Sequence, residues 1–186
     1  MEASLRGAAV DVRELPLNIQ EVRSFLKQNF SGPGVLEALR FRLETHLADP
    51  MQDPLSAQVW AAYLELPKKI ETPCTILDAG CMSGFLYHHL KRHLTDFKYV
   101  GVDRWEEALE VGREFAPEVE FINGDIENGY FGQFDYVVCS NIPWQTGDQK
   151  KAFDNLYRQT RRALFFIHPG NVIETFERTT ANPPDA

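Results

Sequence analysis

The sequence predicts an α/β protein, with a doubly wound, mainly parallel sheet that follows an N-terminal helical extension. In residues 1 to about 70, apolar side chains recur at helical spacing. After residue 70, short apolar runs alternate with helical segments, the pattern of a parallel sheet with helices on both faces. The first run ends in a glycine-containing turn, where such a sheet places its ligand-binding turn. We therefore expect a helical extension or lid at residues 1–70 and a ligand-binding domain at residues 71–186.

Composition is that of an ordinary globular domain. The chain has 186 residues, of which 44% are hydrophobic and 25% are charged. No stretch approaches the ~20 apolar residues that a membrane span needs, and the first residues lack the apolar core of a signal peptide. The three cysteines have no metal-type spacing, which favours reduced thiols and a cytoplasmic location. The net charge of −8 argues against a nucleic-acid partner, which usually requires a basic surface.

Three helices are expected in the extension, over residues 18–30, 36–47 and 55–66. The first two contain apolar stripes separated by the breaker "SGPG", and the third follows an Asp-Pro pair suited to a helix start. Such stripes usually pack in a core. If the helices instead cover the site, the side chains expected to line a substrate wall are Phe30, Trp60 and Tyr63.

Five strands are expected after residue 70, because five short apolar runs are bounded by turns or helical segments. These runs are "CTILDAG", "YVGVD", "VEFING", "FDYVVCS" and "ALFFIHP". The following segment, "NVIETFER" at residues 171–178, is expected to be helical. A five-stranded sheet would leave one edge open to a partner or to a second copy of the chain.

Acidic residues at successive strand ends indicate the kind of ligand. The first turn, "ILDAGCMSGFL", has the pattern Asp78-x-Gly80-x-x-x-Gly84. A carboxylate there would repel a pyrophosphate but attract a ligand with an ammonium and a sulfonium group, such as S-adenosylmethionine. Asp103 follows the glycine turn by about twenty residues, where an acid accepts hydrogen bonds from ribose hydroxyls. Asp125 ends the third strand region and can accept from an adenine amino group.

Residues 74 to about 168 resemble the class I S-adenosylmethionine-dependent methyltransferases. The matching pieces are "ILDAGCMSGFL", "YVGVDRWEEALEVGREF", "VEFINGDIEN" and "FDYVVCSN", in the order and spacing of the family and over about half of the chain. The resemblance implies a Rossmann-like core, S-adenosyl-L-methionine as cofactor and a methyltransferase activity. The cofactor-binding residues that it implies are Asp78, Gly80, Cys81, Gly84, Asp103, Arg104, Trp105, Asp125, Ile126 and Ser140.

The sequence departs from the family in two places. Position 82, where the family usually has glycine, is Met82. We expect Met82 at negative φ, with its side chain turned from the ligand or closing one pocket wall, because a non-glycine residue at positive φ costs about 1–3 kcal/mol. The second departure is the family's last strand pair, of which the segment after "ALFFIHP" shows no sign.

The segment "SNIPWQ" gives the clue to the methyl acceptor. It resembles the motif of methyltransferases that act on planar amino groups, in which Asn141 would hold the amino group and Trp144 would stack on the ring. Methyltransferases with small acceptors have loops of similar composition here, and Pro-Trp also starts helices. His168 ends the fifth strand and is a candidate base. The catalytic candidates are thus Asn141, Trp144 and His168, and no metal site is expected.

Several functions remain open from the sequence. The leading one is methyl transfer to a small or medium molecule. The alternatives are methyl transfer to a nucleobase-type amino group, a cofactor-binding subunit without catalysis, and, more remotely, a nicotinamide-dependent oxidoreductase. The spacing of Gly80 and Gly84 and the acid at Asp78 disfavour the last of these.

Overall fold

The computed structural model describes residues 33–52, 57–140, 147–168 and 170–178. Its helical elements are α2 (Pro33–Ala48), η2 (Pro50–Gln52), α4 (Trp60–Glu65), η3 (Leu66–Lys69), α5 (Phe85–Leu90), α6 (Glu106–Phe115) and α7 (Gln149–Arg158). Its strands are β1 (Cys74–Ala79), β2 (Phe97–Asp103), β3 (Glu120–Asn123), β4 (Phe134–Ser140), β5 (Thr160–His168) and β6 (Val172–Glu177).

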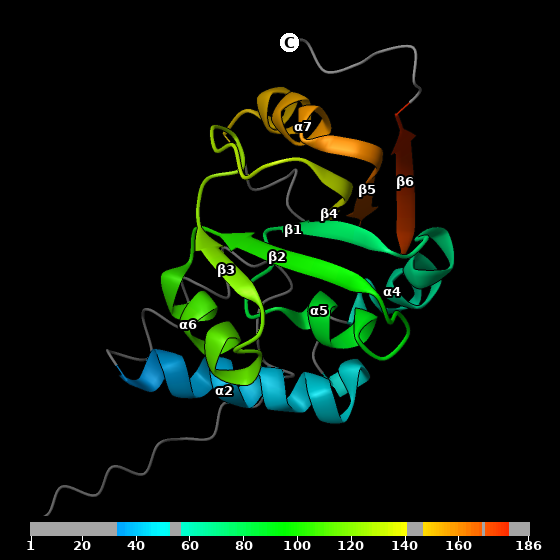
Figure 1. The fold of residues 1–186 in the computed structure, drawn as a ribbon. Helices are drawn as coiled ribbons and strands as arrows, with labels where there is room; N and C mark the ends of the chain where they lie inside the picture. The colour runs from blue at the N-terminus through cyan, green and yellow to red at the C-terminus, as the bar shows by residue number, and fades with distance from the viewer. Residues whose placement is uncertain (1–32, 53–56, 141–146, 169, 179–186) are drawn as a thin grey trace, which may run out of the picture.

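One sheet organises the molecule, with strand order β3-β2-β1-β4-β5-β6 (Figure 1). The first five strands are parallel to their neighbours, and the order reverses direction between β1 and β4. The expected α/β class and mainly parallel sheet are therefore confirmed. Because ligands of such sheets bind where the strand order reverses, the carboxyl ends of β1 and β4 mark the centre of the site.

The expectation of five strands, with residues 171–178 helical, is wrong. Val172–Glu177 form β6, which pairs antiparallel with β5 from His168↔Val172 to Ala163↔Glu177. Gly170 and Asn171, in the connection between these strands, both have positive φ, at 85° and 66°. Glycine and asparagine tolerate this backbone region and are typical of tight hairpin turns. The turn therefore folds the segment back onto the sheet as a strand.

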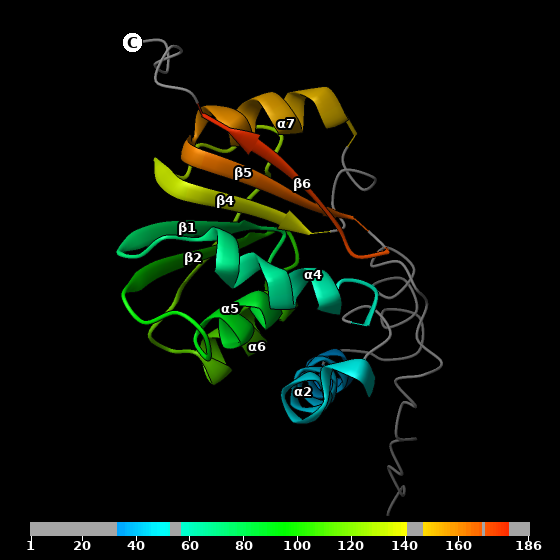
Figure 2. The same ribbon diagram turned by 90° about the vertical axis from the view of Figure 1, so that its right-hand side faces the viewer.

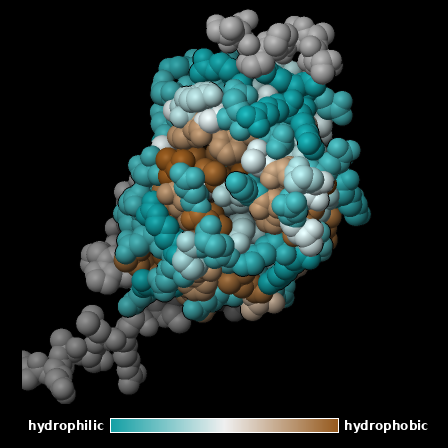
Figure 3. Space-filling view, in the orientation of Figure 1, coloured by the Kyte–Doolittle hydropathy of each residue, from teal (hydrophilic) through white to brown (hydrophobic). Residues whose placement is uncertain are grey.

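The helices cover the two faces of the sheet unequally. In Figure 2, α4, α5, α6 and α2 lie on one side and α7 lies on the other. Residues 124–133, which join β3 to β4, contain no helix. On the α7 side, Val100, Ile122 and Phe131 are consequently only half-buried, and Figure 3 shows apolar surface below α7. None of the described helices is long and apolar enough to cross a membrane.

The N-terminal helices pack against the sheet domain. The apolar stripe expected over residues 36–47 lies on α2, where Leu39 and Leu43 are buried with Trp105 and Val111. Residues 60–66 of the third expected helix lie in α4 and η3, and Leu66 joins the main core of the sheet. The first expected helix lies outside the described residues. The division at residue 70 stays a prediction.

Asn171 ties the hairpin to α4. The residue at the N-cap of α4 is Val59, whose side chain makes no capping hydrogen bond. Asn171 supplies the cap from the other end of the chain, because its Oδ1 accepts from the backbone N–H of Ala61 at 2.9 Å and of Ala62 at 3.3 Å. Helix starts leave such N–H groups without intrahelical partners, and side-chain oxygens stabilise them. The β5–β6 turn therefore fixes α4 over the sheet.

Two substitutions of Asn171 should separate the stability contributed by its capping hydrogen bonds from the cost of its positive φ. We expect Asn171→Gly to lower the free energy of unfolding by about 1 kcal/mol, the usual value of a helix cap. Asn171→Ala should cost roughly 1 kcal/mol more, because alanine is also disfavoured at positive φ. Urea titrations of both variants, with Asn171→Asp as the cap-preserving control, measure this. Equal stability of Asn171→Gly and wild type would contradict the capping role.

Candidate functional site

The carboxyl ends of the five parallel strands lie along the same side of the sheet. Ala79 of β1 is in register with Val102 of β2 and Cys139 of β4. The residues that follow these positions, Gly80, Asp103 and Ser140, therefore lie together around the point where the strand order reverses. The sequence predicts a ligand-binding crevice here from its strand-end acids; the topology brings these strand ends together, and ligand binding stays a prediction.

The glycine turn is anchored to β2. The backbone N–H groups of Gly80 and Cys81 both donate to the carbonyl of Val102, at 2.7 and 3.0 Å. Gly80 and Gly84 have φ of 84° and 80°, a region that favours glycine. A Cβ on Gly84 would also lie 2.9 Å from the ring of Phe121. The two glycines therefore allow β1 to turn sharply into α5.

Met82 adopts a conformation that the sequence did not predict. Its φ is +50°, so the expectation of a negative φ is wrong. The reason lies in the turn, where the Met82 N–H points at the side chain of Asp103 and donates to Oδ2 at 2.9 Å. A methionine here carries the cost of roughly 1–2 kcal/mol that L-residues have in the left-handed region. Met82 thus has a backbone conformation that glycine adopts more readily.

The Met82 side chain is directed toward α2. It packs against the buried cluster that contains Leu39, Leu43 and Phe85. Nη1 of Arg42, a residue of α2 with 2% exposure, donates to the Met82 sulfur at 3.3 Å. The Arg42 guanidinium also lies over the Phe85 ring, 4.7 Å from its centre. Helix α2 therefore holds the glycine turn from outside.

Asp103 joins the glycine turn to the start of α6. Oδ2 accepts from Met82 N–H, and Oδ1 accepts from Trp105 N–H at 2.9 Å. Both bonds fix the orientation of the carboxylate. Each carboxylate oxygen can accept more than one hydrogen bond, so Asp103 keeps capacity for ligand hydroxyls. The ring of Trp105 is only 2% exposed and packs with α2, while Arg104 is exposed.

Asp78 lies at the base of the crevice and is 3% exposed. Its Oδ2 accepts a short hydrogen bond from the hydroxyl of Tyr99 on β2. Burial raises the pKa of Asp78 to about 7; the charge of Asp103 adds to this rise, and the Tyr99 hydrogen bond opposes it. A ligand cation would favour the ionised carboxylate. Burial also raises the pKa of the neighbouring Cys81, with further contributions from Asp78 and Asp103.

Asp125 is held in the turn after β3. Its Oδ1 accepts from Glu127 N–H at 3.0 Å, and its Oδ2 accepts from Asn128 Nδ2 at 2.8 Å. The hydrogen bond from Glu127 N–H is the main cause that lowers the pKa of Asp125. These hydrogen bonds fix the Asp125 carboxylate in the turn, and its role in binding stays a prediction. Ile126, the next residue, is buried against the α7 side of the sheet.

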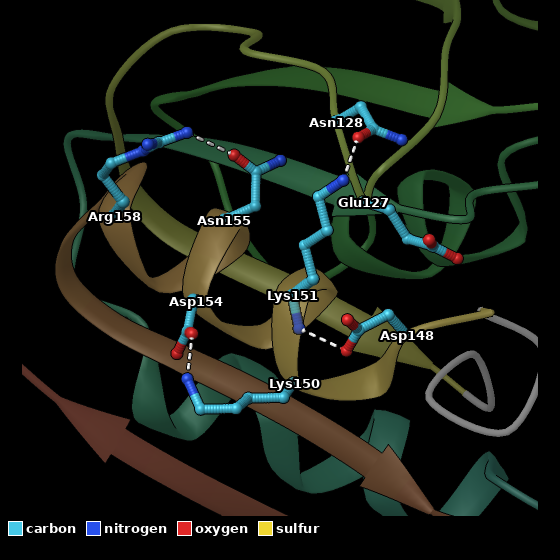
Figure 4. A pocket seen from close by; sticks show the side chains of 8 residues that line it. All are labelled: Glu127, Asn128, Asp148, Lys150, Lys151, Asp154, Asn155 and Arg158. Carbon is cyan, nitrogen blue, oxygen red and sulfur yellow. Dashed lines mark hydrogen bonds and ion pairs between the residues drawn. The ribbon is translucent and has the colours of Figure 1, made fainter.

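A polar pocket of about 460 Å³ lies between this turn and α7 (Figure 4). Its charged side chains are internally matched: Lys150 contacts Asp154, and Lys151 contacts Asn128. Glu127 accepts from Gly147 N–H at 2.5 Å. The pocket thus has no surplus of either charge that would select an ion, and its contacts join the β3–β4 turn to α7.

The acceptor side of the crevice is described in part. Ser140 ends β4, and its Oγ accepts from the hydroxyl of Tyr63 on α4 at 3.3 Å. His168 ends β5, with Nε2 3.3 Å from Oε2 of Glu174. Asn141 and Trp144 lie outside the described residues. Ser140 and His168 are at the predicted edge, and their roles stay predictions.

Sequence reasoning missed Tyr99 and Arg42 as site residues. Tyr99 could have been found from strand alternation, because residues 99, 101 and 103 share one face of β2. Asp78 points to the same face from β1, in register with Gly101. Arg42 gave no signal, since nothing in the sequence indicates which turn of α2 meets the glycine loop.

Comparison with known proteins identifies the family of this fold. Residues 76–163 match the family model described as a methyltransferase domain. This match confirms the resemblance to class I S-adenosylmethionine-dependent methyltransferases. S-adenosylmethionine is the cofactor of the family. The residues described above fit it, since a buried carboxylate, Asp78, and an oriented carboxylate, Asp103, lie at the carboxyl ends of neighbouring strands beside the glycine turn.

Individual proteins are similar to this chain in part of their sequence or in their fold. The chain is 31% identical over 102 residues to the magnesium-protoporphyrin O-methyltransferase of Rhodobacter capsulatus, covering 51% of this chain and 45% of that protein. The chain therefore spans about half the length of this curated relative. A TehB-like SAM-dependent methyltransferase from Corynebacterium glutamicum has a similar structure, with a TM-score of 0.57 and 18% identity over 73% of each chain. The plantazolicin methyltransferase BpumL, solved with SAH, has a TM-score of 0.50 and 20% identity, covering 78% of this chain and 61% of its own.

Asp78 should make cofactor binding depend on pH. Its pKa of about 7 means that Asp78 is mostly protonated below that pH. A ligand ammonium requires the carboxylate, so affinity should fall as pH drops through 7. We expect the affinity for S-adenosylhomocysteine to decrease about eightfold from pH ~7.5 to ~6, as one linked proton requires. Calorimetry measures this, with Asp78→Asn as the non-titrating control. The same pH profile for both proteins would refute the assignment.

At position 82 glycine should stabilise the folded protein more than alanine does, the reverse of their usual order. Both Met82→Ala and Met82→Gly lose the packing on α2, but only glycine relieves the backbone at φ +50°. We expect Met82→Gly to be more stable than Met82→Ala by about 1 kcal/mol. Chemical denaturation of the two variants gives the difference. If Met82→Ala is the more stable, the positive φ is not maintained in solution.

Proposed function

We propose that the protein is an S-adenosylmethionine-dependent methyltransferase that acts on a small or medium molecule. The observation that supports this most strongly is the methyltransferase-domain match over residues 76–163, which contains both acids at the centre of the crevice. Asp103 is oriented by two backbone N–H groups, and Asp78 is buried beside it. Such fixed carboxylates suit a ligand with ribose hydroxyls and positive charge.

In this proposal one part of the site binds the cofactor and another part binds the methyl acceptor. S-adenosylmethionine supplies an electrophilic methyl group. Asp103 accepts from the ribose hydroxyls, Asp78 faces the ammonium group, and Asp125 with Ile126 borders the adenine. Ser140 and His168 lie on the acceptor side, where His168 would take a proton from an oxygen or nitrogen nucleophile. The remaining contribution is to hold the two reactants at close distance and to exclude water.

The acceptor class rests on two observations. The curated relative carries the name of a methyltransferase that modifies a porphyrin, a small molecule. The net charge of −8 also opposes a polyanionic acceptor. The alternative acceptor, a planar amino group of the nucleobase type, depends on Asn141 and Trp144 and stays a prediction. A cofactor-binding subunit without catalysis would bind the cofactor and transfer nothing.

The experiment combines cofactor binding with methyl transfer. We expect calorimetry to show binding of S-adenosylhomocysteine and none of NAD, with Asp103→Ala weakened by about 1.5–3 kcal/mol for lost hydrogen bonds to a charged group. Glu120→Ala is the matched control, since this acid lies on β3 and is exposed. Equal binding by wild type and Asp103→Ala would refute the proposed cofactor site.

Transfer is then measured with the tritiated methyl group of S-adenosylmethionine. The acceptors are small carboxylic acids, phenols and amines, together with a single-stranded oligonucleotide. We expect label in the small-molecule pool. Label in the oligonucleotide, lost in Asn141→Ala without loss of melting temperature, would favour the amino-group alternative. Tight cofactor binding with no label in any pool would support the subunit alternative.

A further inference from the structure

The two edges of the sheet differ in how their backbone is protected. At β3, Arg113 of α6 donates through Nη2 to the outward carbonyl of Phe121 at 3.0 Å. Glu106 holds the same guanidinium at 2.7 Å. A side chain therefore occupies this edge, which hinders pairing with another strand. No described residue pairs with the outer side of β6 at the opposite edge.

The backbone of β6 presents a regular set of outward groups. Arg178 N–H donates to Arg162 at 2.7 Å, which identifies these two as a hydrogen-bonded pair with β5. Antiparallel pairs alternate, so the N–H and C=O groups of Ile173, Thr175 and Glu177 point away from β5. The Tyr157 hydroxyl donates to the Glu177 carbonyl at 3.3 Å, and a carbonyl has a second lone pair to offer. The β6 edge thus carries a neutral hydroxyl at one carbonyl, where the β3 edge carries a guanidinium, and no described strand pairs with its outer side.

An aromatic strip runs beside this edge on the α7 side. Phe176 of β6 packs against Phe153 of α7, with ring centres 5.0 Å apart. Phe153 in turn stacks on Tyr157, at 5.7 Å and 9°. The side chains of Phe153, Tyr157 and Phe176 are each half-buried. The open edge therefore has apolar surface next to it, as sheets that continue into a partner require.

Two charged residues, Glu174 of β6 and Arg178 directly after this strand, lie on the same face as the aromatic strip. Glu174 is exposed and precedes Phe176 by two residues, and Arg178 follows it by two. The Arg178 guanidinium lies over the Tyr157 ring, 4.9 Å from its centre. Its Nε is buried and has no hydrogen-bond partner among the described residues. A carboxylate placed opposite Arg178 would complement it.

We propose that β6 pairs antiparallel with β6 of a second copy of this chain, with Phe176 on the two-fold axis. In this register Glu174 lies directly opposite Arg178 of the second copy, and the reverse pair forms by symmetry. Thr175 of one copy lies opposite Glu177 of the other, and the two residues exchange backbone hydrogen bonds through their outward N–H and C=O groups. The aromatic strips of the two copies meet on the α7 side. One sheet then runs through the dimer.

Charge selects this register over its neighbours. An axis at Glu174 would place two carboxylates opposite each other, which is unfavourable. An axis at Thr175 would place Glu174 opposite Phe176 and leave Arg178 opposite Val172. Only the axis at Phe176 matches both charges at once, in non-hydrogen-bonded pairs where side chains approach most closely. A basic strand from another protein would match Glu174 but would leave Arg178 uncompensated.

The test is the oligomeric state of the full chain, measured by sedimentation velocity at micromolar concentrations. We expect wild type to form a dimer. Glu174→Arg and Arg178→Glu should each raise the dissociation constant at least about tenfold, since each change creates two like-charge pairs. The double variant restores the pairs in exchanged order and should return to within about threefold of wild type. Glu120→Arg, the same reversal at the β3 edge, should leave the dimer unchanged.

A monomeric wild type overturns the proposal, as does a dimer that neither reversal weakens. Failure of the double variant to recover overturns the register. Should a reversal variant not fold, Phe176→Cys gives a second measurement. A cysteine on the axis should form an intermolecular disulfide under mild oxidation by copper–phenanthroline, whereas Val172→Cys should not. The native cysteines are buried and do not interfere. Equal cross-linking of the two variants would refute the axis.

Discussion

The hydrogen bonds of the Asp103 carboxylate set the shape of the crevice. One oxygen holds the N–H of Met82 in the glycine turn, and the other holds the N–H of Trp105 at the start of α6. These segments follow neighbouring strands, so a single side chain fixes the separation of both loops that face the ligand. The same bond to Met82 keeps that residue at positive φ. The hydrogen bond between Met82 N–H and Asp103 thus both holds the strained backbone of the turn and orients the Asp103 carboxylate.

The N-terminal helices support this arrangement from outside. Arg42 and the core of α2 hold the Met82 side chain, and Asn171 caps α4, which brings Tyr63 to Ser140. The turn between β5 and β6 therefore influences the acceptor side through α4, although β6 itself lies at the far edge of the sheet. If β6 is the dimer contact, the partner rests on the same strand pair that positions α4.

The sequence predicted the parts of the site that follow from topology. The placement of the acids and of the glycine turn follows from the order of parallel strands. That order is confirmed, and the binding roles of these residues stay predictions. The hairpin was missed because Ile173 and Phe176 are three residues apart, which fits one face of a helix, whereas in β6 they pack on opposite faces of the sheet. Gly170 and Asn171 held the signal, since both tolerate positive φ. Alternation along β2 places Tyr99 on the face toward which Asp78 points, but the hydrogen bond between them also depends on the register of β1 and β2, which one sequence does not specify.

The central claim is that Asp103 orients the loops and at the same time receives the ribose. A crystal structure with S-adenosylhomocysteine tests it most directly. The account predicts both ribose hydroxyls within hydrogen-bonding distance of the Asp103 carboxylate, while Met82 N–H and Trp105 N–H keep their bonds to it. A ribose bound elsewhere, or an Asp103 side chain that releases Met82 to reach the ligand, would contradict it.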